Sequence, residues 1–363
     1  MPALTSFVRR CAVFGVALAA TTAVAVPVIP AASASAGGAN PVAGVPWGIY
    51  KGNGDGLWPA YEASSGADKE LLAKEALNPR VRSYGSWIPT NQVAGIISKD
   101  IVQEQAGDPS TLVWMELFRL YPNEEANNHQ PLKPRDQQAY RDWINAAIQG
   151  IGSARAGIVL EPDLPLTLVS WGPKVRAALT KYAAQQLAAH TNITTYIDGG
   201  SEDWLSVHDL VKLLESAGIR YARGFNLGAS HHDSTASEIR YCRAVSLSLA
   251  KAGYHNKHCV IDTSDNGHPY TNKQFYAKYP KGSFNANNPP TCMSSTQKVC
   301  VALGIPPTTD VTNAKWKLSA AVDKMAASWV DAYVWDGHPW KINNGHDFNM
   351  SAALNAARFD PFF

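Results

Sequence analysis

The decisive stretch of this sequence is GIVLEPDLPL, residues 157–166. Its apolar run at 158–160 is short and uninterrupted, which is typical of a strand buried on both faces. Pro162 has no N–H to donate to a neighbouring strand, so the strand ends there. Glu161 and Asp163 therefore stand at the carboxyl end of a buried strand, where parallel α/β proteins build their sites. A solvated loop with two surface acids is the alternative; the recurrence of the pattern along the chain favours a site.

Strand-like and helix-like segments alternate about seven times, which predicts a parallel sheet with helices outside it. Seven or eight such units indicate a closed or nearly closed barrel. The segments 37–57, 122–134 and 268–312 are expected to be irregular. We expect strands at 80–87, 111–117, 157–160, 193–197, 221–227, 258–261 and 331–335, and helices at 68–77, 90–106, 140–151, 173–189, 210–217, 236–251 and 318–329.

Acidic residues recur where these strands end. Parallel strands share one carboxyl edge, so such side chains converge in space. Each alone is compatible with a helix N-cap or a turn. Several at one edge make a glycosidase-type site plausible. The acids concerned are Glu116, Asp163, Asp198, Asp262 and Asp336.

The first 36 residues have the pattern of a secretory signal peptide. Arg9 and Arg10 precede an apolar run at 11–27, and small residues at 32–36 give two A-x-A cleavage sites. Pro27 and Pro30 break the run, which argues against a membrane anchor. We therefore expect a leader at 1–36, a secreted, extracellular protein formed by 37–363, and no association with a membrane.

The composition indicates which classes of partner to expect and whether the cysteines form disulfides. The net charge is +2 with 17% charged residues and no basic stripe, so nucleic acid is not an expected partner. Without Cys11, which lies in the leader, four cysteines remain, and an even number in an exported chain predicts two disulfides. Three connectivities are open, and we expect the local pairs Cys242–Cys259 and Cys292–Cys300. No C-x-x-C occurs, so zinc or redox chemistry is not expected.

Several segments, in the same order, resemble glycoside hydrolase family 6, the secreted endoglucanases and cellobiohydrolases. The resemblance implies a single-domain α/β fold, a distorted (β/α) barrel of about seven parallel strands, over residues 37–363. It also implies a polysaccharide substrate. We expect no cofactor, no metal and a monomer. The segments are IVLEPD at 158–163, TYIDGGSEDWL at 195–205, CVIDTSDNG at 259–267, ALGIPPTTD at 302–310 and DAYVW at 331–335.

The resemblance also assigns roles to individual residues. Asp163 corresponds to the general acid, Asp198 to an aspartate of the substrate site and Trp204 to a sugar-stacking tryptophan. Asp336 is the second catalytic candidate, while Glu161 is expected to be structural. The remaining substrate-binding candidates are Trp87, Ser230, Asn266 and Trp335.

The sequence departs from the family at residues that matter for catalysis. Tyr121 stands where the family has an aspartate that supports the acid and the water. Asn343 replaces the aspartate that is the usual candidate for the base, and an amide cannot accept a proton as a carboxylate does. Asp265 replaces an arginine, and Gly337 a lysine.

Three interpretations stay open. In the first, the chain is an inverting glycosidase of β-1,4-glucan or another β-linked polysaccharide. Asp163 is its acid, and Asp336, Asp265, Glu124 or His338 assists the water. In the second, the sugar cleft is kept and catalysis is lost. In the third, a different hydrolytic chemistry operates, but neither G-x-S-x-G nor H-E-x-x-H occurs.

The run His231-His232-Asp233 is the one stretch that resembles a metal-binding cluster. Adjacent histidine side chains usually diverge, so we do not expect a metal there.

Overall fold

The structure is a computed structural model that describes residues 39–120, 132–228, 231–280, 289–342 and 347–363. The predicted leader at 1–36 lies outside the described residues. In the described ranges, no helix combines the length and the apolar character needed to cross a membrane.

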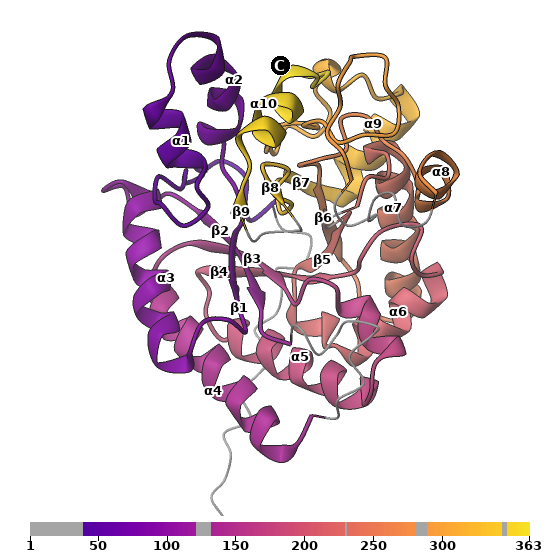
Figure 1. Cartoon of the computed structure of the whole chain (residues 1–363). Coiled ribbons are helices and arrows are strands. Elements are labelled where there is room, and N and C mark those ends of the chain that lie inside the picture. The colour runs from indigo at the N-terminus through magenta and orange to yellow at the C-terminus, as the bar shows by residue number, and fades with distance from the viewer. Residues whose placement is uncertain (1–38, 121–131, 229–230, 281–288, 343–346) are drawn as a thin grey trace, which may run out of the picture. The chain divides into compact units, whose positions relative to one another are not determined.

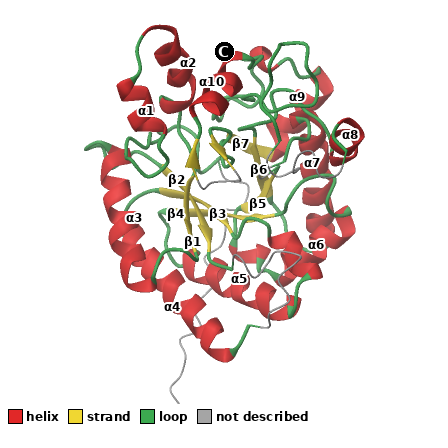
Figure 2. Ribbon diagram, in the orientation of Figure 1, coloured by secondary structure: helices red, strands yellow, loops and turns green. Residues whose placement is uncertain are grey.

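Seven parallel strands form one sheet in which each strand pairs with the next in sequence (Figure 2). The two edges of the sheet approach each other, because the N–H of Val81 donates to the carbonyl oxygen of Trp335 at 2.8 Å. This arrangement confirms the predicted fold of a distorted barrel with seven parallel strands. The strands are β1 (Arg82–Gly85), β2 (Val113–Phe118), β3 (Ala156–Leu160), β4 (Ile193–Asp198), β5 (Gly224–Leu227), β6 (His258–Asp262) and β7 (Val330–Val334).

Helices connect the strands and lie outside the sheet (Figure 1). Their starts have ordinary physical causes: Pro134 opens α4, and the Ser206 hydroxyl caps α6 by accepting the N–H of Asp209 at 3.2 Å. All seven predicted helices are present. They are α2 (Gly66–Ala76), α3 (Thr90–Gln105), α4 (Pro134–Ile151), α5 (Pro173–Leu187), α6 (Val207–Ser216), α7 (Thr235–Lys251) and α9 (Ala320–Trp329).

The sequence did not predict three further helices. Helix α1 (Leu57–Ala63) begins at the end of the lead-in, and α8 (Asn272–Lys278) lies inside the segment expected to be irregular. Helix α10 (Met350–Arg358) follows the last predicted strand and packs against α2 (Figure 1). Short elements complete the fold: the 3₁₀ helices η1 (Leu164–Val169), η2 (Ile219–Tyr221) and η3 (Ala314–Trp316), and the antiparallel pair β8 (Lys341–Ile342) and β9 (Asp347–Phe348).

The strands are buried on both faces, which explains their uninterrupted apolar runs. Side chains at alternate positions point outward to the helices, as Met115, Ile158 and Phe225 do. The intervening positions fill the inside of the barrel. This inner core contains Val42, Val81, Leu112, Trp114, Val159, Tyr196, Val260, Ala332 and Val334.

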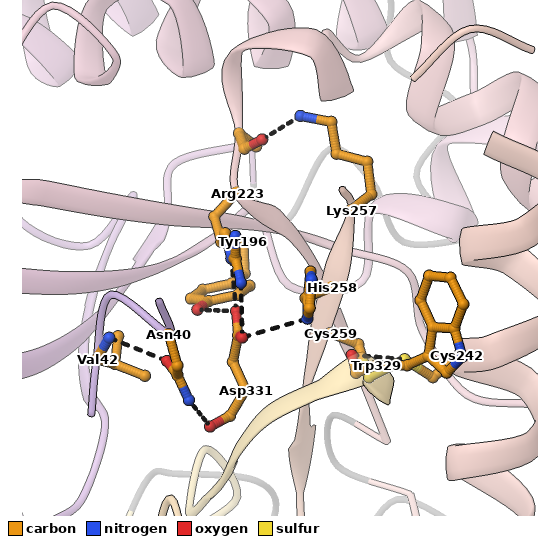
Figure 3. A network of polar contacts seen from close by, with 11 residues as sticks. Asn40, Val42, Tyr196, Arg223, Cys242, Lys257, His258, Cys259, Trp329 and Asp331 are labelled. Atoms are coloured by element: carbon orange, nitrogen blue, oxygen red, sulfur yellow. Dashed lines mark hydrogen bonds and ion pairs between the residues drawn. A yellow bond between two sulfur atoms is a disulfide. The ribbon is translucent and has the colours of Figure 1, made fainter. Parts of the chain in front are cut away.

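One extra residue in β7 distorts the barrel. Cys259 pairs with Val330 and Val260 pairs with Ala332, so Asp331 stands alone in the ladder as a β-bulge. The bulge allows β7 to direct the Asp331 carboxylate toward β4, β5 and β6 (Figure 3).

The Asp331 carboxylate ties these strands together at the amino end of the sheet (Figure 3). Arg223 donates to both of its oxygens, from Nε at 2.8 Å and from Nη2 at 3.0 Å. The hydroxyl of Tyr196 donates to Oδ2 at 2.8 Å, and Nδ1 of His258 lies 3.4 Å from Oδ1. The Asn40 side chain donates to the Asp331 carbonyl oxygen, so the N-terminal segment joins the same network.

Both predicted disulfides are present. Cys242–Cys259 joins α7 to β6, and Cys292–Cys300 closes a short loop. The local pairing is therefore confirmed.

Gly157 offers a direct test of how tightly the barrel interior is packed. A Cβ atom at this position would lie 2.6 Å from the Trp114 ring, whereas one at Gly95, on the exposed side of α3, would meet nothing within 4 Å. We expect Gly157→Ala to lower the free energy of unfolding by about 1–3 kcal/mol. The matched variant Gly95→Ala should raise it by up to about 1 kcal/mol, because alanine favours a helix. Urea unfolding measures both, and equal stability of the Gly157→Ala protein and the wild type would contradict the packing described.

Candidate active site

The turn after β3 has an unusual backbone. Glu161 and Asp163 have φ angles of 54° and 65°, in the left-handed region that few residues other than glycine occupy. Such strain persists only where surrounding contacts hold it, and it occurs often at functional sites. The carboxylate of Glu161 is fully buried and accepts the N–H of Leu120 at 3.0 Å, which fastens this turn to the segment after β2. Asp163 is half-buried and precedes η1.

Polar side chains from the carboxyl ends of five strands, β2 to β5 and β7, meet at one edge of the sheet. Asp198 ends β4, and the N–H of Asp163 donates to its carboxylate. Asn226 in β5 bridges two acids: its Nδ2 lies 3.2 Å from Oδ1 of Asp198 and 3.3 Å from Oδ2 of Asp336. Glu116 in β2 completes the group through a side-chain hydrogen bond with Asp336. All of these residues except Asp163 are at least nine-tenths buried, so Glu116, Asp198 and Asp336 are largely shielded from water.

Asp262 at the end of β6 holds the Asp336 turn in place. Its Oδ1 accepts the N–H of Asp336 at 3.1 Å and that of Ser264 at 2.9 Å. Its Oδ2 accepts the N–H of Gly337 at 2.9 Å. These three backbone hydrogen bonds to one carboxylate hold the backbone of Asp336, and so the Cα from which its side chain extends, in a fixed position.

Burial and mutual repulsion change the protonation of these acids. Burial raises the pKa of Glu116 to about 7, and the charge of Asp163 acts in the same direction. Burial raises the pKa of Asp336 well above its usual range, and the charges of Glu116, Asp262 and Asp198 add to the effect. Two carboxyl groups in contact cannot both ionise without cost, so a proton shared between Glu116 and Asp336 is favoured over two negative charges.

Tryptophans lie at this edge as well. Trp87, just after β1, is 54% exposed. Trp204, after β4, is half-buried, and its ring lies against Gly200. Pro165, in the 3₁₀ helix η1 that follows Asp163, also lies beside Gly200. Both rings are placed where a sugar can contact them.

The other predicted binding residues lie elsewhere. Trp335 is fully buried, and its indole N–H donates to the carbonyl oxygen of Ile305 at 3.0 Å, so in this conformation its ring offers no face to a sugar. Asn266 is also buried, and its Nδ2 donates to Asp233 and Thr235. Ser230 lies outside the described residues.

The comparisons with known proteins agree with this geometry. The sequence profile described as "Glycosyl hydrolases family 6" matches residues 86–335. The chain belongs to this family. Endoglucanase A of Cellulomonas fimi is 32% identical over 209 residues, which are 57% of this chain and 44% of that protein. Endoglucanase 1 of Streptomyces halstedii is 28% identical over 218 residues, which are 58% of this chain and 65% of that protein. The matched region thus spans less than two thirds of either relative.

Solved structures of the family share the fold over most of the described chain. The endoglucanase Cel6 from Mycobacterium tuberculosis, in complex with methyl-cellobiosyl-4-deoxy-4-thio-β-D-cellobioside, has a TM-score of 0.69 at 25% identity, covering 88% of this chain and 99% of that one. The catalytic core domain of the cellobiohydrolase Cel6A from Chaetomium thermophilum has a TM-score of 0.62 at 16% identity, covering 88% and 98%.

Against this family background, the candidates for the catalytic base differ in their surroundings. Asp265 has its Oδ2 3.3 Å from Nε2 of His232. Desolvation lowers the pKa of His338 well below its usual range, with the cations Lys341, Arg82 and Arg80 adding to the effect, so a proton on its ring is disfavoured. Asp336 is the candidate that contacts the buried group described above, through Glu116 and Asn226. Glu124, Tyr121 and Asn343 lie outside the described residues.

Two members of this site were not assigned a role from the sequence. Asn226 carries no charge and lies within the strand GFNL, so nothing marked it as functional. Glu116 was recognised as an acid at a strand end, but its contact with Asp336 depends on the closure of the barrel across β7 and β2. A search for polar residues at inward positions of the strands would have found both.

The buried acids predict how stability depends on pH. Burial raises the pKa of Glu161 to about 7, so the folded protein binds a proton that the unfolded chain has already lost above pH 4.5. The free energy of unfolding should therefore fall as the pH rises from 5 to 7, by about 1 kcal/mol per pH unit for this group. Glu161→Gln mimics the protonated acid and should flatten the slope, measured by urea unfolding across this range. The exposed Glu70→Gln serves as the control, and identical slopes for both variants would contradict the assignment.

Proposed function

We propose that this chain is a secreted glycoside hydrolase that cleaves β-1,4-glucan with inversion, with Asp163 as the general acid. The proposal rests on the arrangement of three acids at the carboxyl edge of a family 6 barrel. Glu116 contacts Asp336, and the charge of Asp163 raises the pKa of Glu116. An inverting glycosidase needs two carboxyl groups with different protonation, one on each side of the scissile bond. The endoglucanase relatives support the substrate class, and the leader pattern and disulfides support secretion.

In the proposed reaction, Asp163 gives its proton to the glycosidic oxygen as the bond to the leaving sugar breaks. A water molecule attacks the anomeric carbon from the opposite face, and the Glu116–Asp336 pair accepts its proton. Asp336 is the member we assign as base, because Asp262 fixes its turn and Asn226 contacts its carboxylate. Glu116 is then a positioning residue that sets the pKa of Asp336.

The role of Asp163 can be tested on soluble β-1,4-glucan and mixed-linkage glucan. Asp163→Asn keeps the shape of the side chain and removes the proton donor, so we expect kcat to fall by about 10²-fold or more. Release of reducing sugar is the measurement, and circular dichroism confirms a matched fold. An active Asp163→Asn protein would exclude this residue as the acid. If the wild type binds glucan and releases no sugar, the chain is instead a carbohydrate-binding relative that has lost catalysis.

The pH profile of kcat/KM distinguishes the two members of the pair. We expect kcat/KM to rise with pH as the pair loses its shared proton, because the base works only after this loss. Glu116→Gln removes the repelling charge beside Asp336 and should move this ascending limb to lower pH while activity remains. Asp336→Asn should abolish activity at every pH. The reverse pattern, with an inactive Glu116→Gln and an active Asp336→Asn, would make Glu116 the base.

A further inference from the structure

A second group of metal-type ligands lies beside Trp204, separate from the acids assigned to catalysis. Asp203 follows β4, while His231 and Asp233 follow β5. Each offers one ligand atom, and these three atoms all lie within 4.8 Å of one another. The sequence predicts no metal at the run 231–233. The rings of His231 and His232 lie with their centroids 6.5 Å apart but have different partners: His232 faces Asp265, and His231 faces Asp203 from another loop.

We propose that Asp203, His231 and Asp233 bind one divalent transition-metal cation of the Zn²⁺ type. The Oδ1 atom of Asp203 lies 3.5 Å from Nδ1 of His231. Two ligands in a tetrahedral zinc site, each about 2.0–2.2 Å from the ion, lie roughly 3.4 Å apart. One imidazole with two carboxylates is a donor set that suits Zn²⁺, whereas Ca²⁺ needs six or more oxygens.

Asp233 supplies an independent reason to expect a cation. Asp233 is only 3% exposed, and its Oδ1 accepts no hydrogen bond from the described residues. Its Oδ2 accepts the hydroxyl of Ser201 at 2.8 Å. A buried carboxylate oxygen without a donor group is costly. The Asp203 and Asp233 carboxyl groups share a side-chain hydrogen bond, which requires a proton between them, and a cation could take the place of that proton.

The surroundings hold each ligand in orientation, as a metal site requires. Asn272 donates its backbone N–H to Oδ2 of Asp203 at 3.4 Å, which leaves Oδ1 toward His231. Ser201 holds Asp233 in the same manner. The indole Nε1 of Trp204 lies 2.9 Å from both ring nitrogens of His231. Ligation needs a ring nitrogen with a free lone pair, which is also the state in which an imidazole accepts an indole N–H.

Metal binding through Nδ1 has a consequence for Trp204. The proton of the neutral imidazole then resides on Nε2, which can no longer accept the indole N–H. Cation binding therefore removes the hydrogen bond between Trp204 and His231, which couples the metal to this sugar-contact candidate.

Isothermal titration of the untagged mature protein with Zn²⁺, Mn²⁺ and Ca²⁺ tests the site. We expect one Zn²⁺ per chain, weaker binding of Mn²⁺ and none of Ca²⁺. Asp203→Asn, His231→Gln and Asp233→Asn should each weaken Zn²⁺ binding at least about tenfold. The exposed His255→Gln should leave it unchanged. Absence of stoichiometric Zn²⁺ binding, or equal weakening by His255→Gln, would overturn the proposal.

Asp336→Asn separates this site from the catalytic acids, which could also attract a cation. Zn²⁺ binding should survive this substitution; its loss would place the metal at the catalytic group and overturn the assignment. Tryptophan emission adds a second readout that does not depend on activity. We expect Zn²⁺ to change emission in the wild type and much less in Trp204→Phe, whereas an equal change in both would contradict ligation through Nδ1 of His231.

Discussion

The crowding of acids at one edge of the barrel is the constraint on which the rest of the site depends. Two unit charges 4 Å apart repel by about 4 kcal/mol at the effective dielectric of a partly buried site. Hydrogen-bond donors offset part of this repulsion: Asn226 bridges Asp198 and Asp336, and Asp262 accepts three backbone N–H groups. The charge of Lys341 also lowers the pKa of Glu116. Glu116 and Asp336 share a side-chain hydrogen bond, which requires a proton on one of the two carboxyl groups. This contact, and with it the shared proton, follows from how the barrel is closed.

The order of the strands could be predicted from the sequence because each is a short apolar run buried on both faces. The acids that follow these runs could be predicted too, since parallel strands end at a common edge. Helix α8, of seven residues, is too short to show a clear period, and α10 lies beyond the last repeating unit. The left-handed conformations of Glu161 and Asp163 could not be foreseen, because they depend on contacts with residues distant in sequence, such as Leu120.

The aromatic residues show a second limit of sequence reasoning. Trp87 and Trp335 both follow a strand end, and the sequence alone gives them equal standing as sugar contacts. The structure leaves Trp87 half exposed but covers Trp335 with Leu303 and with Ala356 and Ala357 of α10. Whether a tryptophan at the edge is a platform or part of the core is thus decided by a helix that the sequence pattern did not reveal.

The bulge at Asp331 connects the two ends of the barrel. In a regular strand, neighbouring residues point to opposite faces, and a shift of one residue reverses every side chain. The extra residue lets Asp331 reach Tyr196 and Arg223 at the amino end while Ala332 and Val334 still face the inner core. Asp336 follows in the same alternation and reaches Asn226 at the carboxyl end. A regular β7 would turn Asp331 to the face opposite Ala332 and Val334, away from Tyr196 of the inner core.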